Sequence, residues 1–134
     1  MAETEELLFA NEAFYLAFSG NDLDAMKSIW SETGSPSCIH PGWGVITGYE
    51  EIIASWSAIL GNTQPADISC LDAYGIIRGE VGTVTCFESL NGGYLIATNI
   101  FVREGERWRM VHHQAGPTSA RPDSMDKPDA GNLH

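Results

Sequence analysis

Apolar residues recur at helical spacing through the first half of the chain, and each stretch is bounded by a helix-ending signal. The pattern predicts helices over Glu3–Phe18, Leu23–Trp30 and Tyr49–Leu60. Asn21 and Asp22 both precede the second helix, and either one can cap its N-terminus. The first two helices are joined so tightly that they should form an antiparallel hairpin.

The pattern changes to runs rich in Val, Ile, Thr and aromatic residues beyond position 66, which is typical of strands. The joints between these runs are short and contain glycine, so the strands should form an antiparallel meander. Two shorter strands, Ser37–His40 and Trp43–Ile46, are expected before the third helix. The predicted class is therefore α+β, with helices first and an antiparallel sheet after. The four long strands are expected at Ile68–Ile77, Glu80–Leu90, Tyr94–Arg103 and Trp108–Ala115.

The composition changes again near Pro117, after which Pro, Ser, Asp and Gly dominate and almost nothing is apolar. A segment of this kind cannot bury enough apolar surface to order itself. We therefore predict a single domain over residues 1–117 and a flexible C-terminal tail over residues 118–134.

The Gly105-Glu106 pair between the last two strands favours a two-residue type II′ hairpin turn. Such a turn sets Phe101 opposite Met110 and Asn99 opposite His112, and side chains alternate along each strand. A slip of one residue would exchange His112 for His113, and of the two we favour His112. The mixture of aromatic and polar groups on this face suits a small-molecule pocket. The face comprises Asn99, Phe101, Trp108, Met110, His112 and Gln114.

The opposite face of these strands is also too apolar to be left in water. We therefore expect a homodimer that forms through this outer surface of the sheet. The residues expected on this face are Thr98, Ile100, Val102, Arg109, Val111 and His113.

The charge of the chain limits its partners. Its 134 residues carry a formal net charge of -11, which argues against nucleic acid and anionic membranes. The apolar runs are too short to span a bilayer, and the acidic start differs from a signal peptide. We therefore expect a cytoplasmic location. Three cysteines without metal-type spacing, Cys38, Cys70 and Cys86, should be buried free thiols.

Histidine is the main candidate for chemistry. His40 ends a short apolar strand and His112 lies within the last strand, so a pair across a pocket could act as general base and acid. The alternative is a hydrogen-bonded core histidine, or for His40 a ring packed on Trp43. Consecutive strand residues point to opposite faces, so His112 and His113 cannot both join a metal site. No Gly-rich phosphate loop is present, and no cofactor is expected.

The helix hairpin, His40-Pro41, a third helix led by Gly48, and the final run Trp108-Arg109-Met110-Val111-His112-His113 together resemble a known family. This is the SnoaL-like branch of the nuclear-transport-factor-2-like superfamily. The last strand, followed by Gly116-Pro117, is also similar to the association domain of calcium/calmodulin-dependent kinase II. Over Glu3–Pro117 the resemblance implies a cystatin-like cone, a curved sheet around a cavity, and a dimer on the outer face of the sheet.

Members of this superfamily include ketosteroid isomerases, scytalone dehydratases, polyketide cyclases and epoxide hydrolases, while others only bind or assemble. Fold alone does not choose among these activities. The isomerases and cyclases need a carboxylate in the cavity, and the only central candidates are Glu88 and Asp72. We expect Glu88 at the rim, close to the Asn91-Gly92 turn, and either carboxylate could simply be solvated. The family's usual catalytic aspartate has no clear counterpart.

The sequence thus favours a protein that binds a small, largely apolar organic molecule, and that could act as a cofactor-free isomerase, dehydratase or cyclase. His40 and His112 are the catalytic candidates. One rival is a non-catalytic ligand-binding or oligomerisation module, and another is a scaffold whose own side chains fill the cavity. The expected ligand contacts are Trp43, Tyr74, Glu88, Asn99, Phe101, Met110 and His113.

Overall fold

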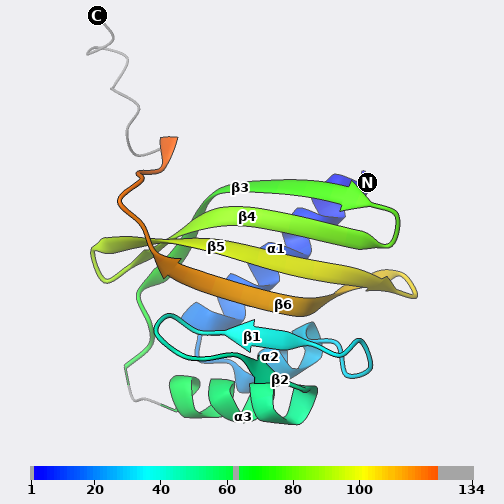
Figure 1. The fold of residues 1–134 in the computed structure, drawn as a ribbon, viewed down its shortest axis with the longest axis horizontal. Helices are drawn as coiled ribbons and strands as arrows, with labels where there is room; N and C mark the ends of the chain where they lie inside the picture. The colour runs from blue at the N-terminus through cyan, green and yellow to red at the C-terminus, as the bar shows by residue number, and fades with distance from the viewer. Residues whose placement is uncertain (1, 62–63, 124–134) are drawn as a thin grey trace, which may run out of the picture.

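The computed structural model describes residues 2–61 and 64–123. Three helices pack against one face of a six-stranded sheet whose strand order is β2-β1-β6-β5-β4-β3 (Figure 1). All neighbouring strands are antiparallel except β1 and β6. The chain is therefore α+β as predicted. Its elements are α1 (Glu3–Ser19), α2 (Leu23–Ile29), β1 (Ser37–Ile39), β2 (Ile46–Thr47), α3 (Tyr49–Leu60), β3 (Ile68–Arg78), β4 (Val81–Leu90), β5 (Gly93–Glu104) and β6 (Arg107–Pro117).

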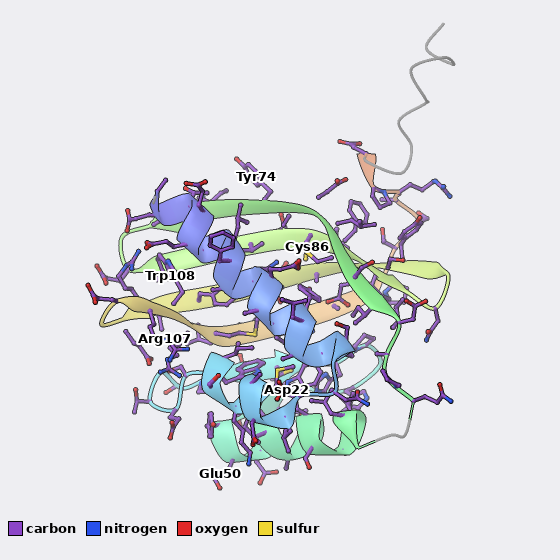
Figure 2. The ribbon with its side chains drawn as sticks, turned by 180° about the vertical axis from the view of Figure 1, so that it is seen from behind. Asp22, Glu50, Tyr74, Cys86, Arg107 and Trp108 are labelled. Atoms are coloured by element: carbon purple, nitrogen blue, oxygen red, sulfur yellow. The ribbon has the colours of Figure 1, made fainter. Side chains whose placement is uncertain are left out.

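The helices lie where the apolar periodicity placed them. α1 runs obliquely across the long strands, while α2 and α3 lie beside the short strands β1 and β2 (Figure 2). Asp22 caps α2, because its Oδ1 accepts a hydrogen bond of 3.0 Å from the backbone N–H of Ala25. The prediction of a strand over Trp43–Ile46 was wrong in its bounds. That strand is the two-residue β2, and residues 40–45 form a loop.

The hairpins follow their turn residues. Asn91 and Gly92 both have positive φ, 51° and 88°, as a type I′ turn requires. Gly105 has a φ of 63°, and the turn it begins pairs Arg103 with Trp108. This part of the predicted register is confirmed as far as Phe101 opposite Met110.

A β-bulge in β6 then changes the register. Ile100 pairs with His112 and Asn99 pairs with His113, so Val111 is an extra residue on β6. A one-residue insertion reverses which face every later side chain occupies. The prediction that His112 faces inward opposite Asn99 was therefore wrong. His113 is the buried residue of the pair, and His112 is only half-buried.

The same bulge moves Gln114 from the predicted inner face to an exposed position and buries Ala115 instead. A second irregularity, between Leu71 and Tyr74, lies in β3 and includes Asp72, whose φ is 55°. The regular pairing of the sheet is thus interrupted at two points, one beside His112 in β6 and one at Asp72 in β3, and both residues are candidates for the functional site.

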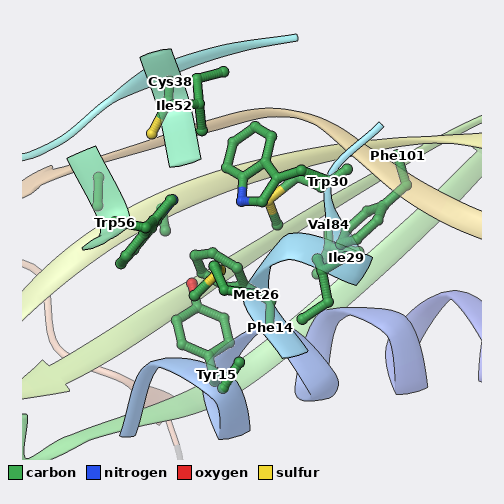
Figure 3. Close-up of a cluster of buried hydrophobic side chains, with 14 of the residues drawn as sticks. Phe14, Tyr15, Met26, Ile29, Trp30, Cys38, Ile52, Trp56, Val84 and Phe101 are labelled. Atoms are coloured by element: carbon green, nitrogen blue, oxygen red, sulfur yellow. The ribbon is translucent and has the colours of Figure 1, made fainter. Parts of the chain in front are cut away.

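The interior is filled by large side chains. Aromatic rings from α1 and α3 meet the sheet there, and Phe14 of α1 makes edge-to-face contacts with Tyr15 and Trp56 (Figure 3). The fully buried side chains include Leu7, Phe14, Met26, Trp30, Ile52, Trp56, Val84, Phe101 and Met110.

None of the helices in the described parts of the chain combines the length and apolar character needed to cross a membrane. Residues 124–134 of the expected C-terminal tail lie outside the described residues, and the division of the chain at position 117 stays a prediction.

Candidate functional site

A hydrogen-bonded group of polar side chains is buried between α1 and the inner face of the sheet. It consists of Asn11, Tyr15, Glu88, Asn99 and His113, here called the polar cluster, and each member is 2% exposed or less. Buried polar groups of this kind are costly unless they satisfy one another.

Local periodicity brings the polar cluster together. Asn11 and Tyr15 are four residues apart on α1, so both face the sheet. Strand alternation and register place Glu88, Asn99 and His113 on three adjacent strands, with Asn99 directly opposite His113. The inward side of β6 can supply His113 only because of the bulge at position 111.

Glu88 and Tyr15 form the shortest contact that involves a carboxylate in this cluster. The Tyr15 hydroxyl donates to Glu88 Oε2 at 2.7 Å. Burial raises the pKa of Glu88 to about 6, and the hydrogen bond from Tyr15 acts in the opposite direction. Burial and the neighbouring Glu88 carboxylate raise the pKa of Tyr15 far above its usual range. Glu88 therefore titrates close to neutral pH, while Tyr15 remains a hydrogen-bond donor.

Asn99 fixes the orientation of His113. Its Nδ2 donates to Asn11 Oδ1 at 2.8 Å and to Tyr15 Oη at 3.1 Å, which leaves Oδ1 to accept from His113 Nδ1 at 2.6 Å. This assignment places the proton of the neutral imidazole on Nδ1. Nε2 then lies 4.0 Å from Glu88 Oε2. Burial lowers the pKa of His113 to about 3, so the two groups are not a charged pair at neutral pH.

His40 lies in a second buried position near the polar cluster. Its Nε2 is 2.9 Å from Ser55 Oγ, and its ring makes edge contacts with Trp43 and Trp56 at centroid distances of 4.9 and 4.8 Å. Burial lowers the pKa of His40 to about 4. The rings of His40 and His113 are 6.5 Å apart. The interior pair is thus His40 with His113, and both are neutral at pH 7.

His112 does not join this pair. It lies on the outer side of the bulge, where its Nδ1 is 2.7 Å from Ser37 Oγ. The expectation of a His40–His112 pair across a pocket was therefore wrong, and its physical reason is the extra residue at Val111. Burial lowers the pKa of His112 as well, while contacts to Gln114 and Ser37 oppose the shift.

The remaining predicted contacts divide into buried and exposed groups. Phe101 and Met110 are fully buried core residues, whereas Trp43 is half-exposed and Tyr74 is 64% exposed at the free edge of the sheet (Figure 2). The placement of Tyr74 as a pocket wall was therefore wrong, because the bulge in β3 and the edge position leave it in solvent.

The two carboxylate candidates lie in different environments. Glu88 was expected at the rim, but it is 2% exposed, because its strand position points inward toward Tyr15 on α1. Asp72 is exposed in the bulge of β3. Of the two, only Glu88 belongs to the interior.

A surface groove between α1 and β3 reaches the polar cluster. Its larger part has a volume of ≈ 360 Å³, and a smaller part of ≈ 120 Å³ shares Glu12 and Cys70 with it. Asn11 lines the larger part and Tyr15 lines the smaller one. We call the two parts together the α1–β3 groove. Its other lining residues are Glu5, Leu8, Phe9, Leu16, Ser19, Ile68, Ser69 and Ala73.

Asn11 and Tyr15 lie on the inward face of the first predicted helix, and the sequence assigned neither of them a role. The available signal was an asparagine in an otherwise apolar stripe, which needs a buried partner. Neither that partner nor the groove follows from local pattern.

The Cys38 thiol is not activated, whereas a hydrogen bond with Cys70 lowers the pKa of the Cys86 thiol. Cys38 Sγ lies 3.7 Å from His40 Nε2, a basic neighbour that the sequence did not suggest, but burial raises the pKa of Cys38 to about 12. Cys38 and Cys86 are buried free thiols as expected, whereas Cys70 is only partly buried. Within residues 2–61 and 64–123, no three His, Cys, Asp or Glu side chains are arranged as a metal site.

Comparison with known proteins gives one matching family. The sequence model of the SnoaL-like domain matches residues 8–118. In a curated relative, the F-box protein SKIP8 of Arabidopsis thaliana, 116 residues are 30% identical, covering 85% of this chain and 50% of that protein. The chain thus spans about half the length of this curated relative.

Two solved structures are similar over most of their length. A candidate dehydratase of the NTF2-like family from Streptomyces avermitilis is 31% identical with a TM-score of 0.80, covering 88% of this chain and 97% of that one. A candidate calcium/calmodulin-dependent protein kinase type II association domain from Thiobacillus denitrificans is 29% identical with a TM-score of 0.70, covering 82% and 93%. Both resemblances drawn from the sequence are confirmed.

Proposed function

Because the chain belongs to the SnoaL-like domain family, we propose that it binds a small, largely apolar organic molecule and catalyses a cofactor-free proton transfer on it. Isomerisation, dehydration and ring closure are reactions of this kind. The observation that carries the proposal is the Glu88 carboxyl group, buried beside the Tyr15 hydroxyl and titrating near neutral pH. A carboxylate with a pKa close to the working pH is an effective general base.

In this proposal the α1–β3 groove admits the substrate and the polar cluster supplies the chemistry. Glu88 accepts the proton, and once it is protonated it no longer needs the hydrogen bond from Tyr15. The Tyr15 hydroxyl, which keeps its own proton, then turns its single O–H to the oxygen that gains charge. Asn99 holds Tyr15 and His113 in place. The groove is lined mainly by apolar side chains with a few polar groups, which suits a small organic ligand.

Two further features support a SnoaL-like dimeric enzyme. The relative from Streptomyces avermitilis, at 31% identity, carries the name of a candidate dehydratase. Exposed apolar side chains on the long strands, Ile96 and Val81 among them, fit the expected homodimer through the sheet. Light scattering tests this interface, and a monomer at micromolar concentration would contradict it.

The alternative is a non-catalytic module that binds a ligand or assembles. The packed interior favours it, because His40 and His113 are in contact with aromatic rings and are only 3% and 1% exposed. The relative at 29% identity, a candidate kinase association domain, points the same way.

Exchange of substrate protons with solvent separates the two functions without knowledge of the product. A panel of small cyclic and aromatic ketones in D₂O is followed by NMR for loss of the α-proton signals, with the wild type, Glu88→Gln and Tyr15→Phe. We expect Glu88→Gln to slow exchange by about 100-fold or more, as for loss of a general base. Glu51→Gln, an exposed carboxylate at the start of α3, is the matched control and should exchange at the wild-type rate.

Folding of each variant is checked by thermal denaturation, and binding of the panel by ligand-induced stabilisation. Exchange that is equally fast in Glu88→Gln removes the carboxylate from the mechanism. Binding by the wild type without any exchange across the panel supports the non-catalytic alternative.

A further inference from the structure

The α1–β3 groove has a charge as well as a shape. Its apolar walls are Leu8, Phe9 and Ala73, and the carboxylates of Glu5 and Glu12 stand on its α1 side. Among the described residues that line it, none is a lysine or an arginine. We propose that this groove selects a small organic cation, a protonated amine on an apolar or aromatic body. The inference rests on the proposed function for the location of the ligand, and it adds the chemical class.

The negative charge at the groove belongs to one stripe of α1. Glu5, Phe9, Glu12 and Leu16 follow each other at helical spacing, and Phe9 and Leu16 are 61% and 64% exposed. Acidic and large apolar side chains therefore alternate along the wall of the groove. Glu5 Oε1 accepts a hydrogen bond of 3.3 Å from the backbone N–H of Ala2, which keeps this carboxylate at the start of the helix.

The floor of the groove is neutral where the structure describes it. Asn11 Nδ2 donates to Cys70 Sγ at 3.5 Å, so these two floor groups partly satisfy each other, and the amide of Asn11 carries no charge. A hydrogen bond to Cys86 and burial raise the pKa of Cys70, and the charge of Glu12 adds to the effect. Cys70 thus remains a neutral thiol. The cation Arg103 is engaged elsewhere, 2.8 Å from Glu3 and stacked on Trp108.

A protonated amine matches each of these features. Its ammonium group can approach the carboxylate of Glu12, with Glu5 about two helical turns away adding a weaker, longer-range attraction, and the exposed ring of Phe9 between them can add a cation–π contact. Its apolar body can occupy the space of ≈ 360 Å³ between Leu8 and Ala73. An anionic ligand would meet the two carboxylates and the net charge of -11.

A matched pair of probes tests the charge preference directly. 2-Phenylethylammonium and 2-phenylethanol have nearly the same size and differ in charge. Titration at low ionic strength, followed by amide chemical shifts, should place both in the groove through shifts at Leu8, Cys70 and Ala73. We expect the cation to bind about fivefold more tightly than the alcohol, the upper end of the gain from one exposed ion pair. The preference should disappear at about 1 M salt, where the screening length is about 3 Å.

Variants assign the preference to the groove. Glu12→Gln should bring the affinity ratio of the two probes close to one without weakening 2-phenylethanol. Glu51→Gln removes the same charge from α3 and should leave the ratio unchanged. Equal affinity of the two probes for the wild type, shifts located elsewhere, or absence of cation binding would each overturn the inference.

Glu88→Gln separates this inference from the proposed proton transfer. A variant that loses α-proton exchange but keeps the fivefold preference supports both. If the wild type shows the preference but no exchange, the cation site stands and the proton-transfer proposal fails. If the wild type shows exchange that depends on Glu88 but no preference for the cation, proton transfer stands and the cation site fails.

Discussion

The buried carboxyl group of Glu88 predicts an unusual dependence of stability on pH. Its pKa rises from an ordinary value of 4.5 to about 6 in the folded protein, mainly because of burial. The folded state therefore holds this proton more tightly than the unfolded state does. The stability that results is fully present below pH 4.5 and is lost as the pH rises through 6.

The magnitude follows from the shift. A difference of 1.5 between 4.5 and about 6, at about 1.4 kcal/mol per pH unit, is about 2 kcal/mol. Glu88→Gln removes the titration but keeps an oxygen that can accept from Tyr15. As the pH rises from 4 to 8, the free energy of unfolding of the variant should therefore increase by about 2 kcal/mol relative to that of the wild type. A change in the free energy of unfolding that the substitution causes equally at every pH cancels when the values at pH 4 and pH 8 are compared.

The assay is urea unfolding of both proteins at several pH values from 4 to 8, with Glu51→Gln as the control. With an m-value of about 2 kcal/mol/M, the midpoint of Glu88→Gln should rise by about 1 M relative to the wild type across this range. Subtracting the wild-type curve also removes the contribution of the histidines, which titrate in both proteins.

A difference in urea midpoint between Glu88→Gln and the wild type that stays constant from pH 4 to pH 8 would refute the reasoning. It would mean that Glu88 keeps its ordinary pKa and hence its contact with water. The closed polar cluster, and with it the use of Glu88 as a base near neutral pH, would then be wrong.

Three further predictions concern single side chains. Asp22→Ala removes the cap of α2 and should cost about 1 kcal/mol in urea unfolding, whereas a loss near zero would contradict the observed bond to Ala25. Phe14→Ala opens a space beside Trp56 and should cost about 3–5 kcal/mol, visible as a lower melting temperature. Because burial lowers the pKa of His40 to about 4, its contribution to stability is present above 6.5 and lost as the pH falls. When the pH falls from 7 to 5, the free energy of unfolding, measured with urea, should therefore decrease by about 2 kcal/mol less in His40→Gln than in the wild type. An equal decrease in both proteins would contradict this.

Much of the fold could be predicted because its signals are local. The bounds of Tyr49–Leu60 match α3, and the turn at Gly105 fixes the pairing of Phe101 with Met110. Helical spacing, glycine turns and strand alternation each act over a few residues, so one sequence is enough to read them. Tyr74 was misplaced because exposure of an edge strand depends on the order of the whole sheet.

The candidate site could be predicted only in part, because its contacts are distant in sequence. Glu88 lies close to a turn, which suggested solvent, and only the approach of Tyr15 from α1 explains its burial. The bulge at Val111 has no marker, since a valine fits an undisturbed strand equally well. Without the bulge, every side chain of β6 from His112 onward would lie on the opposite face of the sheet.

The bulge has a consequence for how the family can vary. If β6 paired without it, and Phe101 stayed opposite Met110, His112 would take the inward position opposite Asn99 that His113 now holds. The doubled histidine therefore supplies an imidazole to the interior in either pairing. Redundancy of this kind would let a lineage gain or lose the bulge while the ring beside Asn99 is preserved. Relatives that carry a single histidine here should be confined to one of the two pairings.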